Sequence, residues 1–156
     1  EGTNGIQAID LIGRKVAREN GETVKALMAE IKGVVVDLAA AGDADLAVIA
    51  KRLEDALGAL DKATDWIVEG YSRDIDGALA VAVPYLALLG TTAGGWMMGA
   101  AALAVSGSGE TNQTFTAAKI ATARFYADHV LTDVSALCEK VVHGGPSVSG
   151  INIDEI

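Results

Sequence analysis

Four side chains of this 156-residue chain are the first candidates for chemistry: Glu1, His129, His143 and Cys138. His129 and His143 are fourteen residues apart, and no further ligand stands at metal-site spacing, so no metal site is predicted. His143 is expected near a helix C-terminus, where a positive charge is favourable. Cys138 has no histidine three or four residues away, which favours a small core residue over a reactive thiol.

The glutamate is Glu1, and it is followed by Gly2 and Thr3. A carboxylate works as a base when a dry pocket raises its pKa until its strength suits the reaction. Residue type alone favours a simpler interpretation, in which a glutamate at the first position is a solvated chain end. The choice between the two depends on the residues that follow.

The segment Glu1-Gly2-Thr3-Asn4-Gly5-Ile6-Gln7 resembles the catalytic turn of acyl-CoA dehydrogenases, flavin enzymes that desaturate acyl thioesters. The family typically shows Glu-Gly-Thr, a few residues, Ile-Gln and then a helix. The resemblance implies that Glu1 is the base, taking the proton next to the thioester carbonyl while a hydride leaves the next carbon for FAD. It also implies that Gly2 positions the substrate carbonyl and that Thr3 lies near the cofactor. Gly5 departs from the family, which often has glutamine there.

The resemblance continues further along the chain. Val83-Pro84-Tyr85-Leu86, Gly94-Gly95-Trp96-Met97-Met98 and the run from Lys119 to His129 are similar to an additional helical module. That module occurs in one bacterial branch of the family, which includes enzymes acting on methylthiopropionyl-CoA. The resemblance therefore implies a C-terminal portion of a larger flavoenzyme.

The resemblance implies two parts, and the local sequence after residue 143 indicates a third. Residues 1–21 would be the catalytic turn and the last helix of the dehydrogenase core, 22–143 the additional helical bundle, and 144–156 an irregular tail. The implied partners are the N-terminal dehydrogenase core, an acyl-CoA substrate, an electron-transfer partner and a second subunit in a homodimer. The piece by itself is expected to hold no FAD and to be inactive. The rival hypothesis is a non-catalytic bundle for interaction or oligomerisation, whose opening resembles the motif by chance.

Composition limits the other classes of function. The net charge of −9 argues against a nucleic-acid partner and against an anionic membrane surface, since both attract basic proteins. A single cysteine makes no internal disulfide and is typical of a reducing compartment, so a cytoplasmic location is expected.

The elements that must position these residues are helices. Hydrophobic residues make up 51% of the chain and aromatic residues 4%, a balance that favours closely packed helices. Apolar residues recur three or four apart in five stretches, with no internal repeat. Gly21 is expected to stop the first and Asp43 or Asp45 to cap the third, while Gly144-Gly145-Pro146 should end the last. We predict an all-α fold, an up-and-down four-helix bundle preceded by one helix; the stretches are 5–19, 22–40, 44–70, 74–105 and 112–143.

The fourth stretch allows two interpretations, because no charged residue lies between Gly77 and Gly109. That length could span a bilayer. Acidic rather than basic residues flank it, which favours a central, fully buried bundle helix in a protein that has no membrane partner. Pro84 should kink this helix. Gly94 and Gly95 are expected where another helix comes close.

Overall fold

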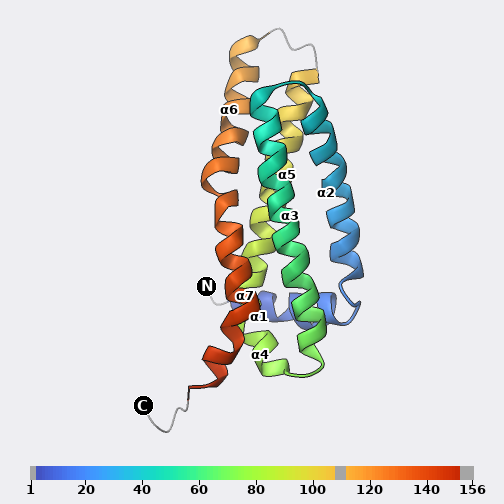
Figure 1. Ribbon diagram of the computed structural model, residues 1–156, viewed down its shortest axis with the longest axis vertical. Coiled ribbons are helices and arrows are strands. Elements are labelled where there is room, and N and C mark those ends of the chain that lie inside the picture. Colours follow the sequence, from blue (N-terminus) through green and yellow to red (C-terminus); the bar gives the residue numbers. More distant parts are fainter. Residues whose placement is uncertain (1–2, 108–111, 152–156) are drawn as a thin grey trace.

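Four long helical arms, each with one apolar stripe, pack side by side in the computed structural model, which describes residues 3–107 and 112–151. No strand occurs among these residues, so the predicted all-α class is confirmed. In Figure 1, α2 and α5 rise, α3 and the α6–α7 arm descend, and α1 crosses the base. The predicted up-and-down bundle preceded by one helix is thus confirmed. The elements are α1 Thr3–Asp10, η1 Leu11–Ala17, α2 Glu22–Ala40, α3 Ala44–Tyr71, α4 Ile75–Ala80, α5 Ala82–Gly107, α6 Gln113–His129, η2 Leu131–Asp133 and α7 Val134–Ser149.

The turns before α2 and α3 follow their local sequence. Asn20 and Gly21 have φ of 51° and 76°, the left-handed conformation that ends a helix, as predicted for Gly21. Of the two candidate caps for α3, Asp43 is the one used: its carboxylate accepts hydrogen bonds from the backbone N–H groups of Asp45 and Leu46, at 2.8 and 3.0 Å.

The fourth predicted helix, 74–105, is two helices, α4 and α5, separated at Val81. Pro84 has no N–H to donate to the carbonyl of Ala80, four residues earlier, so the chain restarts its helix with proline in the first turn. The Asp74 carboxylate caps α4 by accepting from the N–H of Gly77 at 2.9 Å. The predicted kink at Pro84 is therefore a complete break.

The fifth predicted helix, 112–143, is also interrupted, by the short 3-10 segment η2. The side chain of Leu131 in η2 packs over Gly95 of α5, and a Cβ added at Gly95 would lie 2.8 Å from its methyl groups. This contact and the β-branched neighbours Val130 and Thr132 favour a local change of helical pitch over a straight helix.

The predicted helix stop at Gly144-Gly145-Pro146 is wrong, because α7 runs on to Ser149. Gly145 packs directly on the backbone of α4, and a Cβ there would lie 2.9 Å from the carbonyl oxygen of Gly77. Only glycine permits this tertiary contact. The contact stabilises the helix beyond Pro146, a residue type that usually ends a helix. Residues 144–149 of the expected irregular tail are therefore helical, and residues 152–156 lie outside the described residues.

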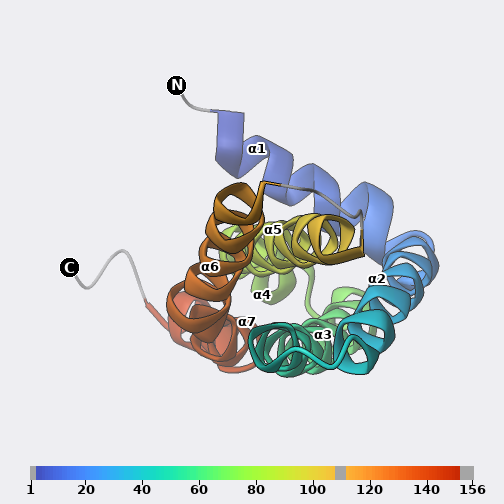
Figure 2. The ribbon, with the colours of Figure 1, turned by 90° about the horizontal axis from the view of Figure 1, so that it is seen from above.

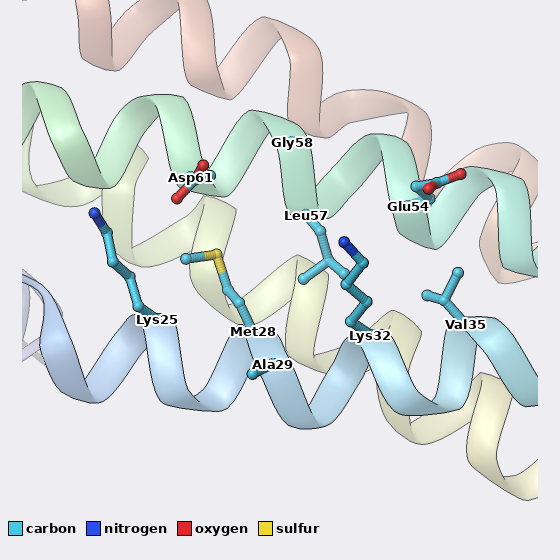
Figure 3. Close-up of a pocket in the computed structure, with 9 residues that line it drawn as sticks. All are labelled: Lys25, Met28, Ala29, Lys32, Val35, Glu54, Leu57, Gly58 and Asp61. Carbon is cyan, nitrogen blue, oxygen red and sulfur yellow. The ribbon is translucent and has the colours of Figure 1, made fainter.

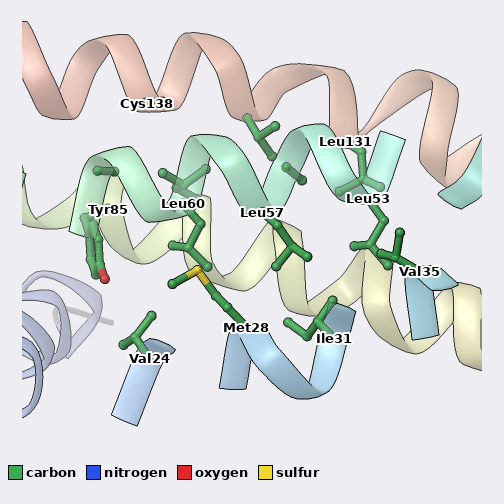
Figure 4. Packing of buried hydrophobic residues seen from close by; sticks show 14 of the residues in the cluster. Val24, Met28, Ile31, Val35, Leu53, Leu57, Leu60, Tyr85, Leu131 and Cys138 are labelled. Atoms are coloured by element: carbon green, nitrogen blue, oxygen red, sulfur yellow. The ribbon is translucent and has the colours of Figure 1, made fainter. Parts of the chain in front are cut away.

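One buried core joins the arms (Figure 4). Its largest fully buried side chain is Tyr85, whose hydroxyl lies 2.9 Å from that of Thr64. Thr64 donates to the carbonyl of Leu60 at 2.7 Å, which leaves Tyr85 as the donor between the two hydroxyls. Burial raises the pKa of the Tyr85 phenol. Both buried hydroxyls have a hydrogen-bond partner, so neither leaves an unsatisfied polar group in the contact between α3 and α5.

The expectation that α5 is fully buried is wrong. Among the described residues, α5 is the one helix long and apolar enough to cross a membrane, a property that buried core helices share. Only 28% of its most apolar window is buried. Leu88, Gly95 and Ala102 face inward, whereas the opposite side of the helix, including Met97, is exposed.

Candidate functional site

Of the three residues that the family resemblance singles out, one lies in the described structure. Thr3 is the exposed first residue of α1. Glu1 and Gly2 lie outside the described residues, so the roles expected for them are untested by the geometry. The base, carbonyl-positioning and cofactor roles accordingly stay predictions.

The helix that follows this turn has two apolar sides. Ala8, Ile12 and Val16 are fully buried and pack against the bundle. Ile6 and Ile9 lie on another side of α1 and are 66% and 48% exposed. A surface helix that packs on one body needs one apolar side, so the second one is an unpartnered surface next to the predicted catalytic turn.

Beside α1 lies an open groove of about 280 Å³ lined by Ile6, Ile9, Asp10, Gly13, Arg14, Tyr71 and Leu79. The Asp10 carboxylate accepts from Arg14 at 3.0 Å and lies 3.7 Å from Lys15. Small-molecule pockets span roughly 300–1,000 Å³, so this groove is too small for a dinucleotide.

A larger groove, about 460 Å³, runs between α2 and α3 on another side of the bundle. Figure 3 shows Lys25 and Lys32 reaching over it from α2, and Glu54 and Asp61 from α3, above an apolar floor that includes Met28 and Leu57. This groove was not among the features predicted from the sequence. The spacing of its charged residues could have indicated it. Each pair is seven residues apart and so shares one side of a helix: Lys25 with Lys32, and Glu54 with Asp61.

Lys25 also binds Asp65 at 2.7 Å, and this hydrogen bond, with the attraction of its charge, raises the pKa of the lysine. A lysine held in its charged form is neither a base nor a nucleophile. The groove therefore offers paired charges and apolar area, without a group prepared for covalent chemistry.

The cysteine and histidines take structural positions. Cys138 is buried in the core, as predicted, and burial raises the pKa of its thiol, which disfavours the reactive thiolate. The ring of His129 stacks on Phe125 with centroids 4.5 Å apart. His143 lies 3.3 Å from Glu139, one turn earlier. No group of three metal-binding side chains forms within residues 3–107 and 112–151.

Comparison with known proteins places the helical bundle in a family. The model of the family described as "Acetyl-CoA dehydrogenase C-terminal like" matches residues 23–152, most of α2 to α7 and the positions just after it. The chain belongs to this family, the C-terminal regions of acyl-CoA dehydrogenases. The match begins just inside α2 and leaves out α1 with its preceding turn.

A particular relative is similar over nearly the whole chain. It is the 3-methylmercaptopropionyl-CoA dehydrogenase of Ruegeria pomeroyi (strain ATCC 700808 / DSM 15171 / DSS-3), which is 37% identical over 150 residues. The alignment covers 95% of this chain and 25% of the relative. The chain thus spans about a quarter of the length of that dehydrogenase.

Proposed function

We propose that this chain is the C-terminal part of a longer FAD-dependent acyl-CoA dehydrogenase, which introduces a double bond between the α and β carbons of an acyl-CoA thioester. The observation that carries the proposal is the family match at residues 23–152 together with the Glu1-Gly2-Thr3 sequence directly before α1. The name of the relative makes methylthiopropionyl-CoA a candidate substrate.

In this proposal each residue of the turn has one task. Glu1 takes the α proton of the thioester, Gly2 leaves room for the substrate carbonyl, and Thr3 contacts the cofactor. Bound FAD supplies the hydride acceptor. The rest of the cofactor and acyl-CoA sites would come from an N-terminal dehydrogenase core, because the groove beside α1 is too small for FAD. An electron-transfer partner and a homodimer complete the proposal.

One observation favours a second candidate. The described helices position no reactive group of their own, as expected for a non-catalytic bundle that mediates interaction or oligomerisation. In that case the longer protein would bind no flavin, and the turn before α1 would be a coincidence.

The experiment is the substitution Glu1→Gln in the longer protein. The amide keeps the size of the side chain but accepts no proton, so we expect turnover to fall by about two to four powers of ten, the usual effect of one general base. Flavin absorbance should be unchanged. The matched control is Glu22→Gln, an exposed glutamate in the first turn of α2, which should keep full turnover. Near-normal turnover of Glu1→Gln would remove this residue from the mechanism.

A further inference from the structure

An uncharged stripe runs along one side of α5. Val83, Gly90, Met97 and Ala104 recur every seven residues, close to two helical turns, and therefore share a side of the helix. All four are exposed; the side chains of Val83 and Met97 are 57% and 49% exposed. We call these four residues the α5 outer stripe.

The α5 outer stripe faces away from the core. On the inner side of the same helix, a Cβ added at Gly99 would meet Leu38, Ile49 and Leu53 at 3.0 to 3.9 Å. Two of those three side chains belong to α3. Seen from above in Figure 2, α5 lies between α3 and α1, so the side of α5 opposite Gly99 is the side on which α1 lies.

The chemistry of this side differs from the rest of the surface. No charged residue occurs between Gly77 and Gly109, although the whole chain carries 12 basic and 21 acidic residues. A continuous uncharged, exposed stripe of this kind marks a surface that another body covers. Its small residues would allow close approach of that body.

The position of α1 indicates which body that is. Figure 2 shows α1 on the same side of α5, and the α1 residues Ile6 and Ile9 are 66% and 48% exposed. In the proposed longer protein, the dehydrogenase core is joined to the bundle through α1, which begins at Thr3. A covalently joined body has a high effective concentration at this surface, which a free partner lacks.

We propose that the α5 outer stripe is the surface on which the dehydrogenase core of the longer protein docks. This inference rests on the proposed function. The additional bundle would then pack against the core and would not be joined to it by a flexible linker alone.

The experiment measures the labelling rate of a single introduced thiol. Met97→Cys places the thiol on the stripe, and Ala104→Cys is a second position on it. The matched control is Val36→Cys on α2, an apolar residue outside the stripe whose side chain is 59% exposed. Native Cys138 is 3% exposed, and labelling of the unsubstituted protein gives the background.

In the 156-residue chain, the thiols on the stripe and the control thiol should react at similar rates. In the longer protein with flavin bound, the Met97→Cys thiol should react slower than the Val36→Cys thiol by at least about tenfold, because the reagent reaches only an accessible thiolate. Unchanged flavin absorbance and thermal melts show that each variant is folded.

Three results would overturn the inference. If the stripe positions and the control position are labelled at equal rates in the flavin-bound protein, the stripe is not a docking surface, and the proposed function is unaffected. Protection in the 156-residue chain that increases with its concentration assigns the stripe to a second copy. Protection that needs added phosphatidylcholine–phosphatidylglycerol vesicles assigns it to a lipid surface. Absence of flavin from the longer protein would instead contradict the proposed function itself.

Discussion

At the scale of residues, the glycines of α5 differ in what surrounds them. The space over Gly94 is filled by Tyr126 of α6, whose hydroxyl donates to the carbonyl of Thr91 at 3.0 Å. The prediction of a close helix at this position is confirmed, although a side chain and not a neighbouring backbone makes the approach. Gly90, four residues earlier, has no other atom within 4 Å of an added Cβ.

These two glycines give a matched pair of substitutions. In Gly94→Ala the new Cβ would lie 2.9 Å from Cζ of Tyr126. We expect the free energy of unfolding to fall by about 1–3 kcal/mol, the usual cost of overpacking. In Gly90→Ala the space is open, so the free energy should rise by up to about 1 kcal/mol through helix propensity. Urea denaturation of the two variants measures both changes, and shifts of the same sign would refute this account.

At the scale of elements, tertiary contacts decide where the helices of this chain begin and end. α7 passes through Gly145 and Pro146 because the backbone of α4 lies against Gly145. Gly144, its neighbour, makes only an ordinary contact, with a Cβ 3.5 Å from Val81. The same local sequence would be expected to end a helix that had no partner there.

This difference predicts opposite behaviour for neighbouring substitutions. Gly145→Ala would bring a methyl group to 2.9 Å from the carbonyl oxygen of Gly77, and a backbone atom has little freedom to move away. We expect a loss of about 1–3 kcal/mol in the free energy of unfolding. The amides from 142 to 149 should also lose protection against hydrogen exchange. Gly144→Ala should keep that protection. Full protection in Gly145→Ala would contradict the packing of α7 on α4.

At the scale of the whole molecule, the exposed residues differ between the α3 side of the bundle, which is charged, and the α1 side, which is largely apolar. Charged residues line the groove between α2 and α3, as on an ordinary solvated surface. The other side presents the α5 outer stripe and the apolar residues Ile6 and Ile9. The match to about a quarter of a much longer dehydrogenase agrees with a surface that belongs inside a larger protein.

A prediction at this scale concerns the cofactor. The 156-residue chain, purified after refolding with excess FAD, should show no flavin absorbance after gel filtration, because the groove beside α1 measures about 280 Å³. The longer protein, treated identically, should retain the cofactor. Stoichiometric flavin on the short chain would show that a site exists within these residues.

The sequence by itself determined the helical class, the bounds of α2, the helix stop at Gly21 and a cap for α3 at Asp43 or Asp45, because apolar periodicity and turn chemistry act over a few residues. The family resemblance also came from local order, in the run from Glu1 to Gln7. Tertiary structure alone decided the break at η2, the continuation of α7 past Pro146 and the exposure of one side of α5. Each of these depends on which element lies opposite: Leu131 on Gly95, Gly77 on Gly145, and no described helix over Met97. Packing between distant segments leaves no period in the local sequence, so these features became visible only in the fold.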